Sequence, residues 1–358
     1  MKKLLLLAFI LFSAFCLFAQ EKPLTQSEFV SLLNDLQRNP SIKTEVVEAI
    51  RRRGIDFQVT DGLIGLTRTK SGGDAELVRT LREAGRRKEN PAAFQLPSAK
   101  ESTSVLEKSR EATLKAVDEM PDFVVKQMIQ RGISYAGTSN FTNLDRLVVA
   151  VSYRSPDISG ANGAEEYRVL SINGAPQTDT KPKGSYFDVG GTSSTGEFVT
   201  VLATIFKAEN DAKFEPVDTD VIRERKAIVY SFAVSVDKKP ESISYGNVDS
   251  TVAGMQGKIW VDRENFRVLR VESNATDIPV DFRVRAAKRT IDYDWVSINN
   301  EKYLLPILSD VRLTSREGKE QYETRNVIRF KEYQKFGSEV KILDGDDEEV
   351  PAEKVKKP

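Results

Sequence analysis

Two aspartates in the C-terminal part of the chain are the most direct candidates for acid–base or metal chemistry. Asp292 and Asp294 are two positions apart in a segment that reads as a β-strand, so both carboxylates project from one face. Paired carboxylates serve glycoside hydrolysis or bind a hard cation such as Ca²⁺. The alternative, which the sequence favours, is a solvated polar face opposite Ile291, Tyr293 and Trp295.

Two Ser-x-x-Lys matches raise the question of a serine–lysine nucleophile. They are Ser235 with Lys238 and Ser338 with Lys341. A spacing of three brings the two groups together on a helix, whereas on a strand it places them on opposite faces. We therefore expect both to be chance matches.

Two further segments superficially indicate ion binding. The loop from Gly190 to Gly196 enters an expected helix and has free N–H groups for an anion, but it lacks the Lys of a phosphate-binding loop and the glycine spacing of a dinucleotide fingerprint. We expect an ordinary helix cap there.

The acidic residues near the C-terminus do not have the spacing of an EF-hand loop, and we expect a solvated tail. They are Asp344, Asp346, Asp347, Glu348 and Glu349.

Four aromatic side chains are the candidate lining of an apolar site. They are Tyr230, Phe232, Trp260 and Trp295. A curved sheet covered by only one or two helices often leaves a groove, in which such rings line a cavity for an acyl chain. The alternative is that the same rings form plain core between sheet and helix.

The composition excludes several classes of chemistry. The 358 residues contain no His and one Cys, Cys16, so Ser-His-Asp catalysis and imidazole-bound zinc are excluded. Cys16 falls in the expected leader, which leaves the mature chain without disulfides, thiolate catalysis or iron–sulfur clusters. The 53 basic and 53 acidic residues balance, so no basic footprint for nucleic acid exists. We predict no cofactor, no metal and no catalytic residue.

The N-terminal residues 1–19 have the three-part pattern of a secretory signal peptide. Lys2 and Lys3 precede an apolar run from Leu4 to Phe18, and Ala19 offers a small residue for cleavage. The run is short for a membrane span, which needs about 20 residues. Phe15 before Cys16 does not fit a lipoprotein signal. No second apolar run of spanning length follows, so we predict export to the periplasm or medium, without a lipid anchor or a transmembrane span after cleavage.

Residues 24–89 predict a small helical module. Thr25 and Glu28 form a capping box before the first helix, and Gly54 ends the second. Thr60 and Asp74 are caps for a third and a fourth helix. The cluster Arg51-Arg52-Arg53 invites an anion-binding role, but cations that complement a helix C-terminus explain it better. The module carries no clustered acid or base, so we expect an interaction unit.

Residues 90–104 predict a linker, and residues 105–343 a helix followed by an antiparallel β domain. From Phe123 onward the hydrophobic period changes from 3.6 to 2, and Asn173-Gly174 is a hairpin turn signal. About eight to ten strands with short turns indicate one large sheet. A capping box at Ser194 and Glu197 predicts a helix from Phe198 to Phe206 that packs on the concave face.

The fold class is therefore α+β: a helical module, then a large curved antiparallel sheet, an open half-barrel, packed by one or two helices. The last residues, 344–358, have almost no apolar content and predict a disordered charged tail.

Several motifs in the β region, in order along the chain, resemble an uncharacterised family of exported bacterial β-rich proteins. Members often have Cys where this chain has Val125, so the resemblance implies no redox role here. In architecture the region is more distantly similar to the outer-membrane lipoprotein carrier group, which holds acyl chains in its concavity. The helical module resembles a small unit at the start of other exported bacterial proteins through residues 53–57. The motifs of the β region are residues 120–123, 190–198, 257–262, 277–279 and 330–337.

Three roles are compatible with these features. The first is a non-catalytic periplasmic or envelope protein that binds an apolar ligand such as a lipid or a lipoprotein acyl chain. The second is an interaction or scaffolding protein that docks an envelope partner through residues 24–89. The third, a carboxylate-dependent hydrolase, needs two acids that converge in one cleft, and the sequence offers no such pair. Binding is favoured because the usual catalytic side chains are missing.

Overall fold

The structure is a computed structural model that describes residues 22–138, 140–155, 164–177, 189–246 and 249–335. The chain divides into two compact units: the first comprises the residues up to Gln95 together with the short stretch 137–139, and the second comprises the other residues from Leu96 onward. Each unit has its own apolar core. The expected leader (1–19) and the expected tail (344–358) lie outside the described residues.

The first unit is built from four α-helices, as the sequence predicts. Its core is formed by apolar side chains at helical spacing, among them Phe29, Leu33 and Leu77, which are fully buried. Leu24 and Ile55 add a short parallel bridge. The helices are α1 (Gln26–Arg38), α2 (Lys43–Arg53), α3 (Asp61–Lys70) and α4 (Ala75–Glu89), with a 3₁₀ turn at Pro40–Ile42 before α2 and another at Pro91–Phe94 after α4.

The predicted helix caps of this unit are confirmed. Thr25 and Glu28 form the capping box, in which the Glu28 N–H donates to the Thr25 hydroxyl and the Thr25 N–H donates to the Glu28 carboxylate. Gly54 ends α2 at φ +70°, a conformation that favours glycine. Thr60 and Asp74 cap α3 and α4.

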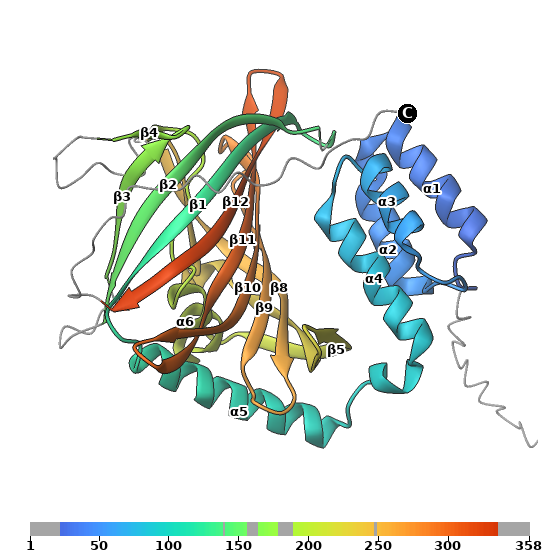
Figure 1. Cartoon of the computed structure of the whole chain (residues 1–358), viewed down its shortest axis with the longest axis horizontal. Coiled ribbons are helices and arrows are strands. Elements are labelled where there is room, and N and C mark those ends of the chain that lie inside the picture. The colour runs from blue at the N-terminus through green and yellow to red at the C-terminus, as the bar shows by residue number, and fades with distance from the viewer. Residues whose placement is uncertain (1–21, 139, 156–163, 178–188, 247–248, 336–358) are drawn as a thin grey trace, which may run out of the picture. The chain divides into compact units, whose positions relative to one another are not determined.

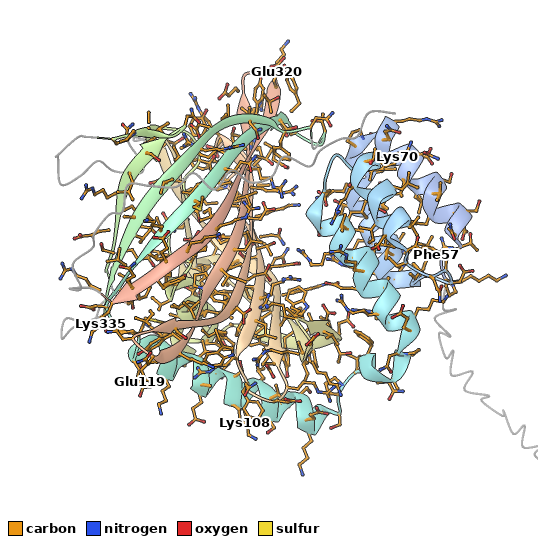
Figure 2. The ribbon with its side chains drawn as sticks, viewed as in Figure 1. Phe57, Lys70, Lys108, Glu119, Glu320 and Lys335 are labelled. Atoms are coloured by element: carbon orange, nitrogen blue, oxygen red, sulfur yellow. The ribbon has the colours of Figure 1, made fainter. Side chains whose placement is uncertain are left out.

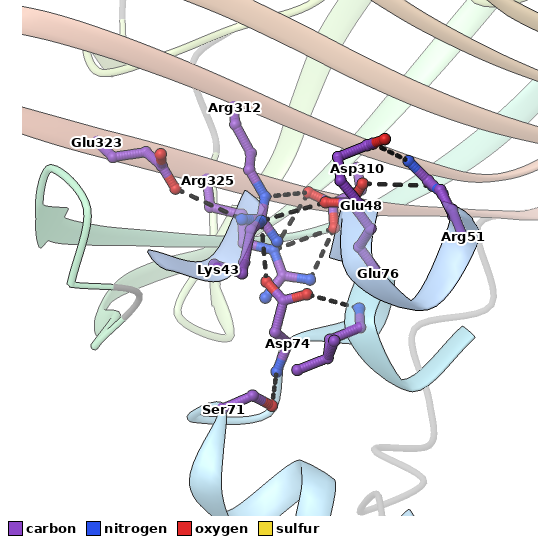
Figure 3. A network of polar contacts seen from close by, with 11 residues as sticks. Lys43, Glu48, Arg51, Ser71, Asp74, Glu76, Asp310, Arg312, Glu323 and Arg325 are labelled. Atoms are coloured by element: carbon purple, nitrogen blue, oxygen red, sulfur yellow. Dashed lines mark hydrogen bonds and ion pairs between the residues drawn. The ribbon is translucent and has the colours of Figure 1, made fainter. Parts of the chain in front are cut away.

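The arginine cluster at the end of α2 has carboxylate partners within the unit. Arg51 lies 3.3 Å from Glu48 and 3.6 Å from Glu76 (Figure 3). Arg53 lies 3.1 Å from Glu28. Lys43 also contacts Glu76, at 3.2 Å. These pairs support the structural interpretation of the cluster over anion binding.

The second unit begins with the long helix α5 (Ala99–Asp118), on which Figure 2 labels Lys108. It starts earlier than the Val105 expected from the sequence because Ser98 caps it: the Ser98 hydroxyl accepts the Glu101 N–H at 3.2 Å. Tyr230 ties α5 to the sheet, since its O–H donates to the Ser102 carbonyl at 2.7 Å.

The strands of this unit form one twelve-stranded antiparallel sheet. Its strand order is β4-β3-β2-β1-β12-β11-β10-β9-β8-β6-β5, and β7 pairs with β8. The first and last strands of the sheet in sequence, β1 and β12, pair in the middle of the sheet. The strands are β1 (Phe123–Tyr135), β2 (Thr142–Arg154), β3 (Ala164–Ile172), β4 (Ala175–Pro176), β5 (Lys213–Ile222), β6 (Arg225–Val234), β7 (Glu241–Tyr245), β8 (Asp249–Asp262), β9 (Val268–Thr276), β10 (Val284–Ile298), β11 (Glu301–Glu317) and β12 (Glu320–Lys335).

The sheet is open, with β4 and β5 at its two edges, and it curves around the short helix α6 (Thr200–Phe206) (Figure 1). Asn173-Gly174 forms the predicted tight turn, with both residues at positive φ. Two apolar clusters lie on the concave face. One contains Phe123, Tyr153 and Phe198, and the other contains Tyr230, Tyr293 and residues of α6. The predicted α+β open half-barrel with packed helices is confirmed.

The predicted capping box at Ser194 and Glu197 is wrong. The helix begins only at Thr200, and its N-cap residue Val199 makes no side-chain cap. Gly196 has φ +84°, which interrupts a helix, and the Ser194 hydroxyl donates to the Glu197 carboxylate instead of capping. Residues 194–199 are consequently irregular and lead into α6 across the concave face.

Candidate functional site

Two of the four predicted aromatic residues lie together on the concave face. Tyr230 and Phe232 are 1% and 3% exposed and share the apolar cluster that α5 and α6 cover. Ile205 and Phe206 of α6 belong to the same cluster. These rings form part of the surface on which the helices pack.

The two tryptophans lie elsewhere. Trp260 is opposite Val229 in the register of β6 and β8, while Ile259 is opposite Tyr230. Because side chains alternate along a strand, Trp260 lies on the convex face, where its indole N–H donates to Asp220 at 3.0 Å. Trp295 is partly exposed and belongs to none of the apolar clusters of the described residues.

The paired aspartates are bound by arginines. Asp292 accepts from Arg270 Nε at 2.7 Å, and Asp294 lies 3.3 Å from Arg223 Nε. Arg223 also lies 3.9 Å from Asp292, so the two carboxylates do share one side of the strand, as predicted. Their charges are compensated by arginine, which agrees with a structural role.

The remaining motifs bring no chemistry together. Ser235 begins a 3₁₀ turn, and the Lys238 ammonium lies 3.9 Å from Asp237. Ser338, Lys341 and the acidic residues at 344–349 lie outside the described residues.

A polar cluster that the sequence did not predict lies within the concave apolar face. We call it the acid–tyrosine cluster: Tyr153, Glu165, Tyr167, Glu197 and Tyr293. Tyr153 and Glu165 are cross-strand partners on β2 and β3. The Tyr167 O–H donates to Glu165 Oε2, and the same oxygen accepts the Gly196 N–H at 3.1 Å. Glu165 thus lies next to the segment that carries Glu197.

Glu197 is the most enclosed member, with no exposed surface. Its Oε1 accepts from the Ser194 hydroxyl, and its main-chain carbonyl accepts the Tyr293 O–H at 3.1 Å. Gly196 is essential to this placement because its φ of +84° turns the chain, and a Cβ there would lie 3.0 Å from Thr200 Cβ.

The segment that carries Glu197 is attached to the sheet by polar side chains at its other end. Arg131 holds Asp145 at 2.6 Å and donates to the Gly190 carbonyl, while Asn326 donates to the Thr192 carbonyl at 2.6 Å. We call residues 189–206 the covering segment, since they extend from these contacts to α6 over the concave face (Figure 1).

Among the residues that the structure describes, neither Glu165 nor Glu197 forms an ion pair, and the cation that acts on Glu165 is Arg289. Arg289 donates to the Thr195 carbonyl at 3.5 Å and is shared with Glu241, at 3.4 Å. Burial raises the pKa of the Glu165 carboxyl above its ordinary value, and the nearby Glu197 carboxylate raises it further, against the opposing hydrogen bond from Tyr167. Burial also raises the pKa of Tyr153 to about 12, helped by Glu165.

Three polar atoms of the cluster have no hydrogen-bond partner although they are buried: Glu165 Oε1, Glu197 Oε2 and the Tyr153 hydroxyl. Two more unpaired polar side chains, Gln127 and Ser309, are fully buried on the same face. Buried polar atoms are almost always paired in folded proteins, because an unpaired one costs about 1–3 kcal/mol. Their concentration here marks a place that a polar group of a ligand would complete.

In chemical terms, the cluster presents hydrogen-bond acceptors inside an apolar surface. A carboxyl of raised pKa beside a second carboxyl is also the arrangement of general acid catalysis. The hydrogen bonds in the cluster fix the position of each carboxyl: Tyr167 and Gly196 donate to Glu165, and Ser194 donates to Glu197. The arrangement therefore favours recognition of a donor group.

Sequence reasoning missed this cluster for a simple reason. Glu165 and Tyr167 alternate with exposed Glu166 and Arg168, a pattern that marks them as inward-facing. Glu197, however, reads as a helix cap from its spacing to Ser194. Only the course of the covering segment brings Glu197 to Glu165.

The described residues contain no group of three or more His, Cys, Asp or Glu side chains that would hold a metal ion. None of the helices in the described ranges is both long and apolar enough to cross a membrane.

No family model matches the chain, and no curated protein matches it. Among solved structures, the chain is distantly similar to a LolA superfamily protein from Nitrosomonas europaea, with 14% identity over 65% of this chain and 92% of that one, at a TM-score of 0.27. A DUF1329 family protein from Desulfovibrio piger matches with 10% identity over 65% and 94%, at a TM-score of 0.30. The Pseudomonas aeruginosa MucA/MucB complex matches with 9% identity over 63% and 94%, at 0.16.

Proposed function

We propose that the chain is an exported binding protein of the periplasm or envelope, whose curved sheet holds an amphiphilic ligand such as a lipid or a lipoprotein acyl chain. The ligand's apolar part contacts the concave clusters, and its polar part meets the acid–tyrosine cluster. The protein acts by binding and release, not by catalysis. The leader pattern at residues 1–19 supports export.

The observation that carries this proposal is the set of unpaired buried polar atoms within an otherwise apolar face. The three unpaired atoms are Glu165 Oε1, Glu197 Oε2 and the Tyr153 hydroxyl, and the Tyr153 ring stacks on Phe123 with 5.0 Å between ring centroids, in the apolar cluster that also contains Phe198. A core without a ligand gains nothing from such atoms, since each one raises the free energy of the folded state. An amphiphile supplies both missing partners, apolar contacts and hydrogen-bond donors.

The test is gentle purification of the exported chain, followed by solvent extraction and mass spectrometry of bound small molecules. We expect an amphiphile near one equivalent per chain. Phe232→Ala and Trp260→Ala form a matched pair, because both remove a buried ring at a cost of about 3–5 kcal/mol, from opposite faces. Loss of the amphiphile from Phe232→Ala alone supports binding on the concave face.

A wild-type chain that purifies without any stoichiometric small molecule would refute the lipid-binding proposal. The second role, an interaction with an envelope protein through residues 24–89, would then take its place. Equal loss from both variants would show that retention depends on overall stability and not on the concave face.

A further inference from the structure

We infer that Glu165, Glu197 and Tyr153 bind the primary ammonium group of an amphiphile, an inference that rests on the function proposed above. The chemical class is an alkyl chain that ends in a –CH₂–NH₃⁺ group.

The first argument is the match between donors and acceptors. A primary ammonium has three N–H donors and no acceptor. The cluster has three unpaired atoms that accept hydrogen bonds: Glu165 Oε1, Glu197 Oε2 and the Tyr153 oxygen. Glu197 and Tyr153 are both completely buried, so bulk water does not serve as their partner.

The second argument is the position of these atoms relative to one another. Tyr153 and Glu165 face each other across β2 and β3. Glu165 also holds the N–H of Gly196, the residue immediately before Glu197. A single small cationic group placed among the three side chains therefore meets all of them.

The third argument is charge. When both carboxyls are ionised, two negative charges lie close together, and Arg289 is divided between Glu241 and the Thr195 carbonyl. The other described ionisable groups that act on the cluster are Asp122, a further carboxyl that raises the pKa of Tyr153, and the phenols of Tyr167, which donates to Glu165, and of Tyr293 and Tyr333. Burial raises the pKa of the Tyr293 and Tyr333 hydroxyls above the ordinary value. An ammonium compensates this charge, whereas a carboxylate or phosphate would add to it.

The surroundings explain why the ligand is an amphiphile rather than a free amine. Phe198 of the covering segment contacts Phe123 at 5.2 Å and Phe330 at 5.5 Å between ring centroids, and Tyr153 belongs to the same apolar cluster. A chain attached to the ammonium thus extends over rings and aliphatic side chains, not into water.

The test is calorimetric titration of the full, delipidated exported chain with decylammonium, decyltrimethylammonium and decanol. Decyltrimethylammonium keeps the charge but has no N–H donor, and decanol keeps the chain length but has no charge. We expect decylammonium to bind at least about tenfold more tightly than either, the range for losing one charge-assisted hydrogen bond.

Variants locate the site. Glu197→Gln should weaken decylammonium binding by about tenfold to a hundredfold and leave decanol binding unchanged. Tyr153→Phe removes only an unpaired hydroxyl, so it folds if the wild type folds, and it should weaken decylammonium binding by about threefold to tenfold. Glu166→Gln is the matched control, because Glu166 is exposed and points away from the cluster.

The outcomes separate this inference from the function on which it rests. If all three probes bind with equal affinity, or if Glu166→Gln weakens decylammonium as much as Glu197→Gln does, the ammonium site is refuted while amphiphile binding stands. If no probe binds, both are refuted. Short-chain phosphatidylethanolamine and phosphatidylcholine distinguish the source: preference for the ethanolamine lipid identifies a phospholipid head group, and binding of decylammonium alone identifies a simple alkylamine.

Discussion

Replacing Phe198 by Ala measures how firmly the covering segment is part of the core. The Phe198 ring is 1% exposed. Its centroid lies 5.2 Å from that of Phe123, 5.5 Å from Phe330 and 6.4 Å from Tyr153, so strands β1, β2 and β12 all contact it. Residues 194–199 of this segment are irregular, and Phe198 is the largest buried apolar side chain among them.

The expected cost follows from these contacts. Phe→Ala changes in cores destabilise by about 3–5 kcal/mol, and an aromatic pair adds about 0.5–1.5 kcal/mol beyond burial. With three ring neighbours, Phe198→Ala should lie in the upper part of that range, about 4–5 kcal/mol. Urea unfolding followed by far-ultraviolet circular dichroism gives the free energy, and an unchanged m-value shows that the same surface is exposed on unfolding.

Phe141→Ala is the control, because it removes the same ring from a partly exposed position. The guanidinium groups of Arg312 and Arg325 lie 5.6 and 5.7 Å from the Phe141 centroid, and the ring is half-buried, so its loss should cost about 1 kcal/mol. If Phe198→Ala costs no more than Phe141→Ala, the covering segment does not contribute to the core as described.

Three further predictions concern stability. Gly257→Ala should destabilise the chain by about 3 kcal/mol in urea unfolding, because its Cβ would lie 1.8 Å from the Glu272 carbonyl oxygen. Gly65→Ala is the contrasting variant: it lies in the middle of α3 and its Cβ would meet nothing within 4 Å, so it should stabilise the chain by about 0.5–1 kcal/mol. At Asp262, burial opposes ionisation, but the N–H groups of Asn265 and Glu264 and the Arg225 guanidinium outweigh it and hold the pKa of that carboxyl below its ordinary value. The resulting stability is present above the unfolded pKa and is lost as pH falls through the folded pKa. Asp262→Asn should therefore make the free energy of unfolding less dependent on pH in the acid range, and an unchanged dependence would contradict this. At Glu165 the sign is opposite, because burial raises the pKa of its carboxyl, so the stability of the ligand-free chain falls as pH rises above the ordinary carboxyl value of 4.5. Glu165→Gln should remove that fall between pH 4 and pH 8. A Gln variant with the wild-type pH profile would show that the pKa of Glu165 is not raised by folding.

Local signals in the sequence identified the elements well. The caps at Thr25, Thr60 and Asp74 and the helix stop at Gly54 depend on neighbouring residues only, and all four are found in the structure. The turn at Asn173-Gly174 is likewise a local matter, since both residues tolerate positive φ.

The candidate site was less predictable because it depends on register and on the course of an irregular segment. Tyr230 and Trp260 both read as inward aromatic residues, yet a register that places Ile259 opposite Tyr230 turns Trp260 to the convex face. A change of one position would have reversed this, and the sequence of either strand alone does not specify it.

Glu165 and Glu197 illustrate the same limit from another side. The strand pattern around Glu165 marks it as inward-facing, but its partner arrives with a connection that leaves one edge of the sheet after β4 and returns at the opposite edge with β5. The hydrophobic periodicity of the sequence does not predict that the connection between β4 and β5 runs from one edge of the sheet to the other.

The central pairing of β1 with β12 determines the order in which this sheet can be completed. Strands β1 to β4 and strands β5 to β12 are two separately contiguous halves, and Phe123 of the first strand pairs with Lys335 of the last. If the chain is exported from its N-terminus, β1 therefore waits with one unpaired edge until the final strand has emerged. An unpaired edge is a template for aggregation, and closing a contact between such distant residues is slow. Because β1 pairs with β12, the chain is most prone to aggregate while strands β1 to β4 have been exported and β12 has not.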